Sequence, residues 1–321
     1  MLGNNPTPTI WNRYTPQSLI GNGMYGKVHK AKCKFSGQTV AIKETLSDAE
    51  GVQPTTLREI AILRQINHIN VIKMIEADQC MKNLQVFIVM EYADQDLYKF
   101  MKSQQPVPLS KYHTKSFLKQ LLTGVAELHK FGIIHRDLKP QNILIIAKKD
   151  DKYLVKIADF GLSRRCGPVH GSYTPETQTM LYRAPEIFMG IDMYTNSVDI
   201  WSCGCIFAEM ARGEPIFQAE REIELWEDIT RILGQPTPSE LALLQNDLIP
   251  IGNREKSNFT DMIPTLCEKG NDLLTAMLGF THHTRVTAKV ALDFPYLSEL
   301  KEQPELFLDK KDAKSTHGSI N

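Results

Sequence analysis

Short alternating segments separated by glycines make up the chain up to about residue 90. "SLIGNG", "GKVHKAKCK" and "TVAIKE" are strand-like pieces, divided by glycines and by a Ser36-Gly37 turn, and "QVFIVMEY" is a later one. Between them, "TTLREIAILRQI" runs without a breaker after Pro54, which suits the first turn of a helix because its missing N–H would have no partner there. The pattern predicts a small sheet with one main helix.

Helical periodicity dominates the later part of the chain. "LSKYHTKSFLKQLLTGVAELHKFG" places Phe117, Leu121, Val125 and Leu128 on one face, with Ser110 as its N-cap. "SVDIWSCGCIFAEMA" is apolar nearly all round, as in a buried helix, and "EIELWEDITRILG" is amphipathic. The second half is therefore predicted to be mainly helical.

Composition and charge exclude several classes of protein. The 321 residues carry 37 Lys plus Arg and 37 Asp plus Glu, so no net field attracts nucleic acid, and we expect no nucleic-acid partner. Six cysteines are scattered without the spacing of a zinc site or a disulfide scaffold, which favours a reducing, intracellular location. The longest strongly apolar stretch, "NILIIA", is far too short to span a bilayer. We expect a soluble protein without a membrane partner.

A glycine-rich stretch is the first candidate for chemistry. "GNGMYGKV" places Gly21, Gly23 and Gly26 in a G-x-G-x-x-G spacing, which by itself fits a dinucleotide fold or a flexible turn. A dinucleotide fingerprint needs a helix directly after the last glycine, whereas here a strand-like segment follows, so we expect the glycines on a hairpin. Lys43 ends the next apolar strand, where an edge lysine reaching solvent is the alternative.

The densest chemistry lies in "GIIHRDLKPQNILI". This stretch sets five polar side chains between an apolar turn and an apolar strand, namely His135, Arg136, Asp137, Lys139 and Asn142. "VKIADFGLS" follows, a strand that delivers Asp159 into a Phe-Gly turn. Loops rarely need so many functional groups, so these residues are candidates for an active site.

Taken in order, the glycine loop, "VAIK", "HRDLKPQN", "DFG" and "APE" at 184–186 resemble the motifs of protein kinases over nearly the whole chain. The resemblance implies an α+β fold with two lobes, a small N-terminal β-sheet lobe with one main helix and a larger, mainly helical C-terminal lobe. The expected division is an N-terminal extension (1–13), the N-lobe (14–91), the C-lobe (92–300) and a mobile tail (301–321), in which periodicity is lost and charge increases.

The same resemblance implies ATP and Mg²⁺ as cofactors. Lys43 would bind the α and β phosphates, and Asn142 and Asp159 would be hard oxygen ligands for Mg²⁺. Asp137 would orient the substrate hydroxyl and accept its proton, while Lys139, in a "DLKPQN" typical of serine/threonine kinases, would stabilise the transferred phosphate.

Other nucleotide contacts follow from the family pattern. Backbone amides of the glycine loop would approach the phosphates, Met90 would be the gatekeeper, Glu91 and Ala93 would offer backbone groups to adenine, and Asp96 would reach the ribose. The remaining expected contacts are the apolar side chains of Ile20, Val28, Ala41 and Leu144.

Glu59 has two interpretations. Ile62, Leu63 and Ile66 follow it at helical spacing, so its carboxylate shares a face with an apolar stripe. A boundary glutamate reaching solvent is the simpler interpretation. By resemblance, Glu59 instead reaches Lys43 and holds it against the nucleotide.

The helix sequence "QPTTLRE" (53–59) resembles the "PSTAIRE" motif of cyclin-dependent kinases and the "PPTTLRE" of their plant B-type members. In that family a bound cyclin pushes this helix into its active position, so the resemblance implies a cyclin partner. Leu57, Ile60 and Ala61 form a second apolar strip, which would face the cyclin or belong to an ordinary core.

The segment "SRRCGPVHGSYTPETQTMLYRAPE" resembles the family's activation loop. It puts Thr174 at the position phosphorylated by an activating kinase, with Arg58, Arg136 and Arg164 at the positions that capture the phosphate. For each arginine alone, a surface salt bridge is the alternative. Tyr25 stands where relatives carry an inhibitory phosphotyrosine, and a packing aromatic is an equal alternative.

Further positions bear on structure or specificity. We expect Glu186 to pair with Arg285 and Asp199 to brace the catalytic loop, Cys203 and Cys205 to be core residues, and 147–152 to be a polar hairpin loop. Thr177 and Gln178 replace two valines that shape the pocket for a proline after the target residue.

The resemblance therefore implies a serine/threonine protein kinase that phosphorylates protein substrates at Ser/Thr-Pro sites, in cell-cycle or transcription control. A small accessory subunit is a further expected partner, and the expected location is the nucleus, the cytoplasm or both. Two alternatives remain: a kinase of the mitogen-activated type that needs no cyclin, and a kinase-shaped scaffold without catalysis.

Overall fold

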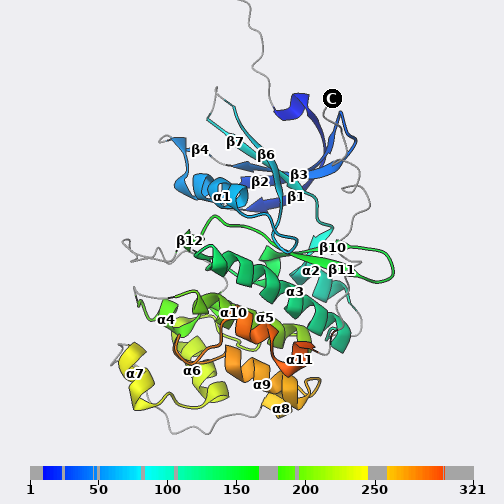
Figure 1. Cartoon of the computed structure of the whole chain (residues 1–321). Helices are drawn as coiled ribbons and strands as arrows, with labels where there is room; N and C mark the ends of the chain where they lie inside the picture. The colour runs from blue at the N-terminus through cyan, green and yellow to red at the C-terminus, as the bar shows by residue number, and fades with distance from the viewer. Residues whose placement is uncertain are drawn as a thin grey trace, which may run out of the picture.

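The computed structural model of the chain describes residues 10–23, 26–45, 47–48, 51–80, 84–104, 108–165, 180–191, 195–244, 259–298 and 300. Figure 1 shows a small upper lobe built on strands and a larger lower lobe built on helices. The predicted two-lobed α+β architecture is confirmed.

The upper lobe is built on an antiparallel sheet that has five strands within the described residues. Their spatial order is β1 (Tyr14–Gly23), β2 (Gly26–Cys33), β3 (Thr39–Thr45), β7 (Val86–Glu91) and β6 (Met74–Gln79). β3 and β7 are buried along most of their length, whereas β1 is exposed beyond its first residue except at Gly21, which is partly buried. The sheet is therefore anchored through its central strands.

The main helix of this lobe, α1 (Pro54–Gln65), begins with Pro54 in its first turn, as predicted. Its buried side chains are those of Thr56, Glu59, Ile62 and Leu63. A two-stranded ribbon of β4 (Ser47–Asp48) and β5 (Gly51–Val52) precedes it. The apolar stripe of the helix thus faces the core and carries Glu59 with it.

Helices make up most of the lower lobe. In chain order they are α2 (Leu97–Ser103), α3 (Lys111–Lys130), η3 (Met180–Tyr182), α4 (Pro185–Phe188), α5 (Ser197–Arg212), α6 (Glu222–Leu233), α7 (Pro238–Leu244), α8 (Phe259–Met262), α9 (Glu268–Met277), α10 (Ala288–Leu292) and α11 (Pro295–Ser298). Ser110 caps α3 as predicted, accepting a hydrogen bond from the His113 backbone N–H at 3.1 Å. None of the described helices is long and apolar enough to cross a membrane.

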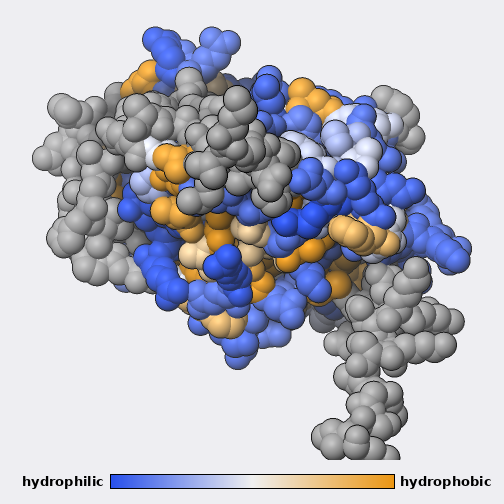
Figure 2. All heavy atoms as spheres, turned by 90° about the horizontal axis from the view of Figure 1, so that it is seen from above, coloured by the Kyte–Doolittle hydropathy of each residue, from blue (hydrophilic) through white to orange (hydrophobic). Residues whose placement is uncertain are grey.

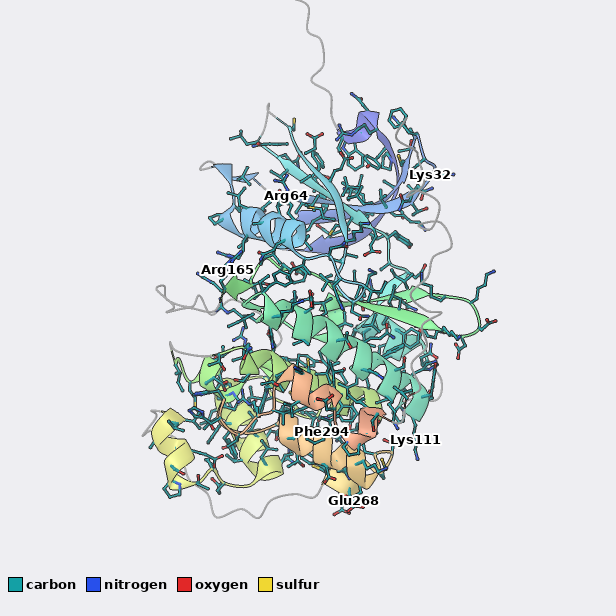
Figure 3. All side chains as sticks on the ribbon, in the orientation of Figure 1. Lys32, Arg64, Lys111, Arg165, Glu268 and Phe294 are labelled. Atoms are coloured by element: carbon teal, nitrogen blue, oxygen red, sulfur yellow. The ribbon has the colours of Figure 1, made fainter. Side chains whose placement is uncertain are left out.

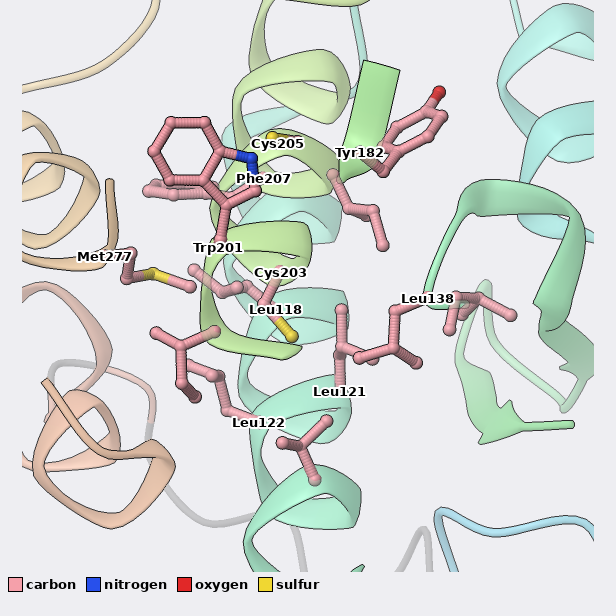
Figure 4. Close-up of a cluster of buried hydrophobic side chains, with 14 of the residues drawn as sticks. Leu118, Leu121, Leu122, Leu138, Tyr182, Trp201, Cys203, Cys205, Phe207 and Met277 are labelled. Carbon is pink, nitrogen blue, oxygen red and sulfur yellow. The ribbon is translucent and has the colours of Figure 1, made fainter. Parts of the chain in front are cut away.

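The core of the lower lobe forms where α3 and α5 pack together. Figure 4 shows Leu118, Leu121 and Leu122 of α3 near Trp201 and Cys203 of α5. Cys203 is fully buried and Cys205 almost so, as predicted for core residues. Because α5 is buried over nearly its whole length, it offers a rigid support for the loops above it.

Short strands carry the loops between the two lobes. β8 (Gln95–Asp96), β10 (Ile143–Ala147) and β11 (Tyr153–Ile157) form one sheet, and β9 (Ile133–Ile134) pairs with β12 (Arg164–Arg165). The 3-10 helix η2 (Pro140–Asn142) leads into β10. Residues 148–152 join β10 to β11, so the predicted hairpin loop is confirmed except for Ala147, which is the last residue of β10.

Two further predictions concern a buried ion pair of the lower lobe and the two ends of the chain. Arg285 and Glu186 form the expected buried pair, with Nη1–Oε1 and Nη2–Oε2 distances of 2.6 and 2.7 Å. Residues 1–9 and the tail 301–321 lie outside the described residues. Ile10, in the 3-10 helix η1 (Ile10–Asn12), is only 1% exposed, so this part of the expected extension packs on the upper lobe.

Candidate active site

A cleft of about 460 Å³ lies beneath the sheet of the upper lobe. β1, β2 and β3 form one side, residues 90–96 follow, and η2, β10 and the start of the Phe-Gly turn form the other. Every residue expected to contact the nucleotide lines this cleft: Ile20, Gly21, Gly23, Gly26, Val28, Ala41, Lys43, Met90, Glu91, Ala93, Asp96, Asn142, Leu144 and Asp159. The structure thus brings together residues that are as far apart in the sequence as Ile20 and Asp159.

Several lining residues were not foreseen from the sequence, namely Asn22, Ile72, Tyr92, Asp94, Gln95, Lys99, Gln141 and Ala158. Most are immediate neighbours of residues that were selected, and extending each motif by one or two positions would have found them. Ile72 carries no such signal, because it reaches the cleft through its pairing with Ile157, 85 residues later: Ile72 N donates to Ile157 O at 2.9 Å.

The glycine stretch forms a hairpin, as predicted, with Gly23 opposite Gly26 and Gly21 opposite Val28. Gly26 has φ 128°, and a Cβ placed there would lie 2.0 Å from the Glu44 carbonyl oxygen. Only glycine fits this position, because both the dihedral angle and the close approach to β3 exclude a side chain. The helix of a dinucleotide-binding fold is not formed here.

A buried ion pair joins the sheet to α1. Lys43 Nζ lies 2.7 Å from Glu59 Oε2 and 3.2 Å from Asp159 Oδ1. Glu59 is 3% exposed, so the interpretation of a solvent-facing glutamate is wrong. Burial alone would lower the pKa of Lys43, but the charges of Glu59 and Asp159 and the hydrogen bonds to both raise it above its ordinary value. The lysine is therefore held in its charged form.

The pKa of Asp159 shifts in the opposite direction to that of Lys43. Burial alone would raise the pKa of its carboxyl, but the charge and hydrogen bond of Lys43 outweigh burial, so the net pKa is lowered. The carboxylate is ionised at neutral pH and lines the cleft. It is thus a hard anionic oxygen ligand beside a fixed cation.

Asp137, Lys139 and Asn142 meet on the loop between β9 and β10. Lys139 Nζ lies 3.2 and 3.0 Å from the two carboxylate oxygens of Asp137. Asn142 Nδ2 donates to the Asp137 backbone oxygen at 2.8 Å and to its carboxylate at 2.9 Å. Because both partners are acceptors, the amide nitrogen must face Asp137, which leaves Asn142 Oδ1 as the oxygen available to a metal ion.

These donors fit a nucleotide with Mg²⁺. Within the described residues, no group of three or more His, Cys, Asp or Glu side chains could hold a metal ion by itself. Mg²⁺ usually takes one or two protein oxygens and completes its shell with phosphates and water. Asp159 and Asn142 meet that requirement, with Lys43 beside them for phosphate charge.

Two site residues have backbone conformations that residues other than glycine rarely adopt. Arg136 has φ 72° and Asp159 has φ 66°, and such left-handed positions cost about 1 kcal/mol or more for residues other than glycine. Asp199 supports the first of them, because its carboxylate accepts the backbone N–H groups of His135 and Arg136, both at 2.9 Å. The predicted brace of the catalytic loop is confirmed.

His129 completes this support. Its Nε2 lies 2.9 Å from Asp199 Oδ2, and Asp199 is only 1% exposed. Burial would raise the pKa of Asp199, but the hydrogen bond and charge of His129, the charge of His135 and the backbone N–H of Arg136 lower it below its ordinary value. His129 was not selected from the sequence, and nothing in its local pattern marked it.

The three arginines expected around a phosphothreonine lie close enough to interact. The pKa of Arg58 is lowered, first by burial and then by the charges of Arg164 and Arg136. Arg58 Nη1 also donates to the Gly161 carbonyl oxygen at 2.8 Å, which ties α1 to the Phe-Gly turn. Three like charges held together favour an anion among them.

Several regulatory predictions lie outside the described residues: those for Thr174, Tyr25, Thr177 and Gln178. Next to that region, Arg165 Nη2 donates to Gln65 Oε1 at 2.6 Å. Figure 3 shows Arg165 between α1 and the lower lobe. The start of the activation segment therefore contacts the C-terminal end of α1.

The second apolar strip of α1 divides between core and surface. Leu57 is 56% exposed and Ala61 is also exposed, whereas Ile60 is partly buried and packs against the main core. The exposed Leu57 and Ala61 are available to a partner. Ile60 packs partly in the core, as the alternative interpretation expected.

Comparison with known proteins agrees with this geometry. The protein kinase domain family matches residues 14–297. The chain is 40% identical over 309 residues to cyclin-dependent kinase B1-1 of Arabidopsis thaliana, covering 90% of this chain and 98% of the relative. It is also 40% identical over 303 residues to cell division control protein 2 homolog C of Antirrhinum majus, with the same coverage.

The chain belongs to the protein kinase family, and within it to the cyclin-dependent kinases. It is a serine/threonine protein kinase of that type. Protein kinases use ATP and Mg²⁺, which agrees with the donors in the cleft.

Replacing the brace of the catalytic loop tests its contribution to stability. We expect Asp199→Asn to lower the free energy of unfolding by about 3–5 kcal/mol at neutral pH, because buried donors lose a charged acceptor. The folded pKa of Asp199 lies below its unfolded value of about 3.9, so its stabilisation is full above that pH and lost as the pH falls through the folded pKa.

Urea unfolding between neutral and acidic pH measures both effects. The variant is expected to lose less stability on acidification than the parent. The exposed Asp272→Asn is the control and should match the parent at every pH. An unchanged acid dependence in Asp199→Asn would contradict the assigned role.

Proposed function

We propose that this kinase transfers the γ-phosphate of Mg²⁺-bound ATP to serine or threonine hydroxyls followed by proline, under control of a cyclin and of phosphorylation at Thr174. The observation that carries the proposal is the Lys43–Glu59–Asp159 set, which faces the same cleft as Asn142. A scaffold without catalysis has no physical need for this buried arrangement, which is costly to desolvate.

Each residue of the set has one task in the proposed reaction. Lys43 binds the α and β phosphates and Glu59 fixes its position, while Asp159 and Asn142 would hold Mg²⁺, which neutralises charge on the phosphates when bound. The transferred phosphoryl group needs little covalent help, so these residues act by positioning and by charge.

The substrate side of the reaction falls to Asp137 and Lys139. Asp137 orients the hydroxyl of the protein substrate and accepts its proton, and Lys139, 3.0 Å from that carboxylate, stabilises the phosphate in flight. Asn142 fixes the orientation of Asp137 through the two hydrogen bonds of its amide.

At the far end of the cleft, Met90 acts as gatekeeper. Backbone groups of Glu91 and Ala93 bind adenine, and the Asp96 side chain reaches the ribose. Ile20, Val28, Ala41 and Leu144 enclose the base, and the amides of Gly21, Gly23 and Gly26 cradle the phosphates.

Regulation is proposed to act through α1. A cyclin would contact Leu57 and Ala61 on its exposed strip and hold Glu59 against Lys43. Phosphate on Thr174, added by an activating kinase, would be captured by Arg58, Arg136 and Arg164, whose mutual repulsion it relieves. Phosphorylation of Tyr25 would act as a brake.

The relatives named above are a cyclin-dependent kinase and a cell division control protein homologue, which supports a role in the cell cycle. A small accessory subunit and a nuclear or cytoplasmic location belong to the same proposal. The Lys43–Glu59 contact of 2.7 Å is the arrangement that a bound cyclin would maintain.

Lys43→Met should abolish phosphoryl transfer. We expect a loss of about a hundredfold or more, because the substitution removes the fixed cation of the site. Transfer of the phosphoryl group from ATP to a Ser-Pro peptide is measured. Thermal unfolding is measured on the same protein, because Glu59 loses its buried partner and a loss of activity must be separated from a loss of folding. Lys32→Met, on the exposed face of β2, is the matched control and should keep full activity. A folded Lys43→Met variant that retains activity would exclude the assigned role of Lys43.

Cyclin dependence is tested by assaying the purified chain with Mg²⁺ and ATP, alone and with each cyclin from its source. We expect activity to appear only with a cyclin, because the cyclin would contact the exposed Leu57 of α1 and hold Glu59, on the same helix, against Lys43. Strong activity of the chain alone would favour the cyclin-independent candidate. Absence of activity under every condition would support the scaffold instead.

Thr174→Ala should lower activity by about tenfold or more relative to the fully phosphorylated parent, because the arginines lose their anion. Ser172→Ala, two residues away and without an assigned role, is the control for changes in the same segment. Equal rates for Thr174→Ala and the phosphorylated parent would contradict the proposed switch.

A further inference from the structure

The four residues Ile10–Arg13, called here the N-terminal cap, close the outer side of the upper lobe. In Figure 1 they include the short dark-blue helix at the top of the molecule. Ile10 is 1% exposed and belongs to a hydrophobic cluster with Tyr14, Ile42 and Phe87. This cluster is separate from the main core, which reaches into the lower lobe.

Polar contacts fix the cap to the β2–β3 turn and to β6. Lys34 Nζ donates to the Trp11 carbonyl oxygen at 2.8 Å, and the Lys34 backbone N–H donates to Arg13 O at 2.9 Å. Arg13 Nη2 lies 2.8 Å from Asp78 and 3.2 Å from Glu76, near the end of β6. The cap therefore links the β1–β2 hairpin to the opposite edge of the sheet.

The hairpin needs such an anchor because β1 contributes little to any core. Only Tyr14 among its residues is buried, and its pairing with β2 is interrupted between Pro16 and Ser18 and between Leu19 and Gly21. Figure 2, which views the molecule from above, shows hydrophobic side chains gathered near the middle of this face with hydrophilic ones around them. Segments with few buried contacts open easily unless they are held at their ends.

Trp11 lies directly behind the strands that line the cleft. Its ring packs edge-on against His29, with centroids 5.4 Å apart, and against Phe87 at 5.8 Å. His29 Nε2 is 2.9 Å from Glu44 Oε2, and Gln85 Nε2 donates to Glu44 Oε1 at 2.7 Å. A chain of contacts thus runs from the cap through β2 to β3 and β7.

The register of the sheet gives this chain a route to the site. Val28 lies opposite Lys43, and both line the cleft. His29 and Glu44 are the next residues on their strands, and because side chains alternate along a strand, they point to the outer face. Contacts of Trp11 with His29 therefore restrain the backbone that carries Val28 and Lys43.

We propose that Trp11 is a positioning residue for the nucleotide: the N-terminal cap holds the glycine hairpin and β3 over the cleft and so sets the affinity for ATP. The inference rests on the proposed function of the cleft. Trp11 does not line the cleft, so the effect of its loss falls on nucleotide affinity and on the motion of the hairpin. The chemistry at Asp137, on the other lobe, is unaffected once ATP is bound.

Trp11→Ala is the test, measured in the full chain under the conditions in which the parent is active. We expect KM for ATP to rise about three- to tenfold with little change in kcat, since aromatic contacts of this kind are worth up to about a factor of ten. Trp11→Phe should recover most of the affinity. Phe35→Ala is the matched control, an aromatic residue that is 84% exposed at the β2–β3 turn, and it should behave as the parent.

A general loss of stability is distinguished by a variant in the lower lobe. Ile232→Val lies in α6, where the side chain is fully buried, and it should lower stability without raising KM for ATP. If Trp11→Ala does not fold, Arg13→Gln replaces it, because it removes the ion pairs to Glu76 and Asp78 and leaves the hydrophobic cluster intact.

Hydrogen exchange without nucleotide separates this inference from the proposed function. We expect faster exchange in β1 and β2 of Trp11→Ala than in the parent, with β11 unchanged. If the parent binds no ATP but Trp11→Ala still exchanges faster than the parent, the cap does hold the hairpin and the proposed function is rejected. The inference would be overturned if hydrogen exchange in Trp11→Ala equals that of the parent. It would also be overturned if the parent binds ATP and the KM for ATP of Trp11→Ala is unchanged.

Discussion

The contact between Lys43 and Glu59 is the constraint on which the rest of the site depends. Two opposite charges, one of them 3% exposed, lie 2.7 Å apart between the sheet and α1. Removing such charges from water costs several kcal/mol per ion, and the cost is offset only while both partners and Asp159 hold their positions. The sheet, the helix and the Phe-Gly turn must therefore be correctly placed at the same time. An arrangement with this property responds to anything that moves α1.

The lower lobe provides the fixed reference for that arrangement. α5 is buried over nearly its whole length, and Asp199 at its start binds the backbone of His135 and Arg136. The left-handed conformation of Arg136 would be unfavourable in isolation, and here the buried carboxylate and His129 stabilise it. Strain in the catalytic loop is thus balanced by a polar network that rests on the best-packed helix of the lobe.

The upper lobe is built differently. Its central strands are buried, but β1 and the glycine hairpin lie near the surface, and Gly26 leaves room for the backbone of β3. A hairpin that closes over a nucleotide needs freedom to open, while its base must stay aligned with Lys43. Tyr14 and the N-terminal cap lie at the base of β1 and satisfy the second requirement.

The sequence by itself determined the hairpin, the main helix and the dense loop, and its ordered motifs, which resemble those of protein kinases, implied the two lobes and most residues of the cleft. Glycine spacing, the helix of Pro54 and the dense loop around Asp137 are local signals, because dihedral preference, periodicity and motif order act over a few residues. Only the tertiary structure decided where Glu59 points, which of Leu57, Ile60 and Ala61 reach the surface, and that Ile72 and His129 serve the site. It also decided that Ile10 and Trp11 belong to the upper lobe. Each of these depends on contacts between residues tens of positions apart, and burial and charge pairing over that separation leave no pattern in the local sequence.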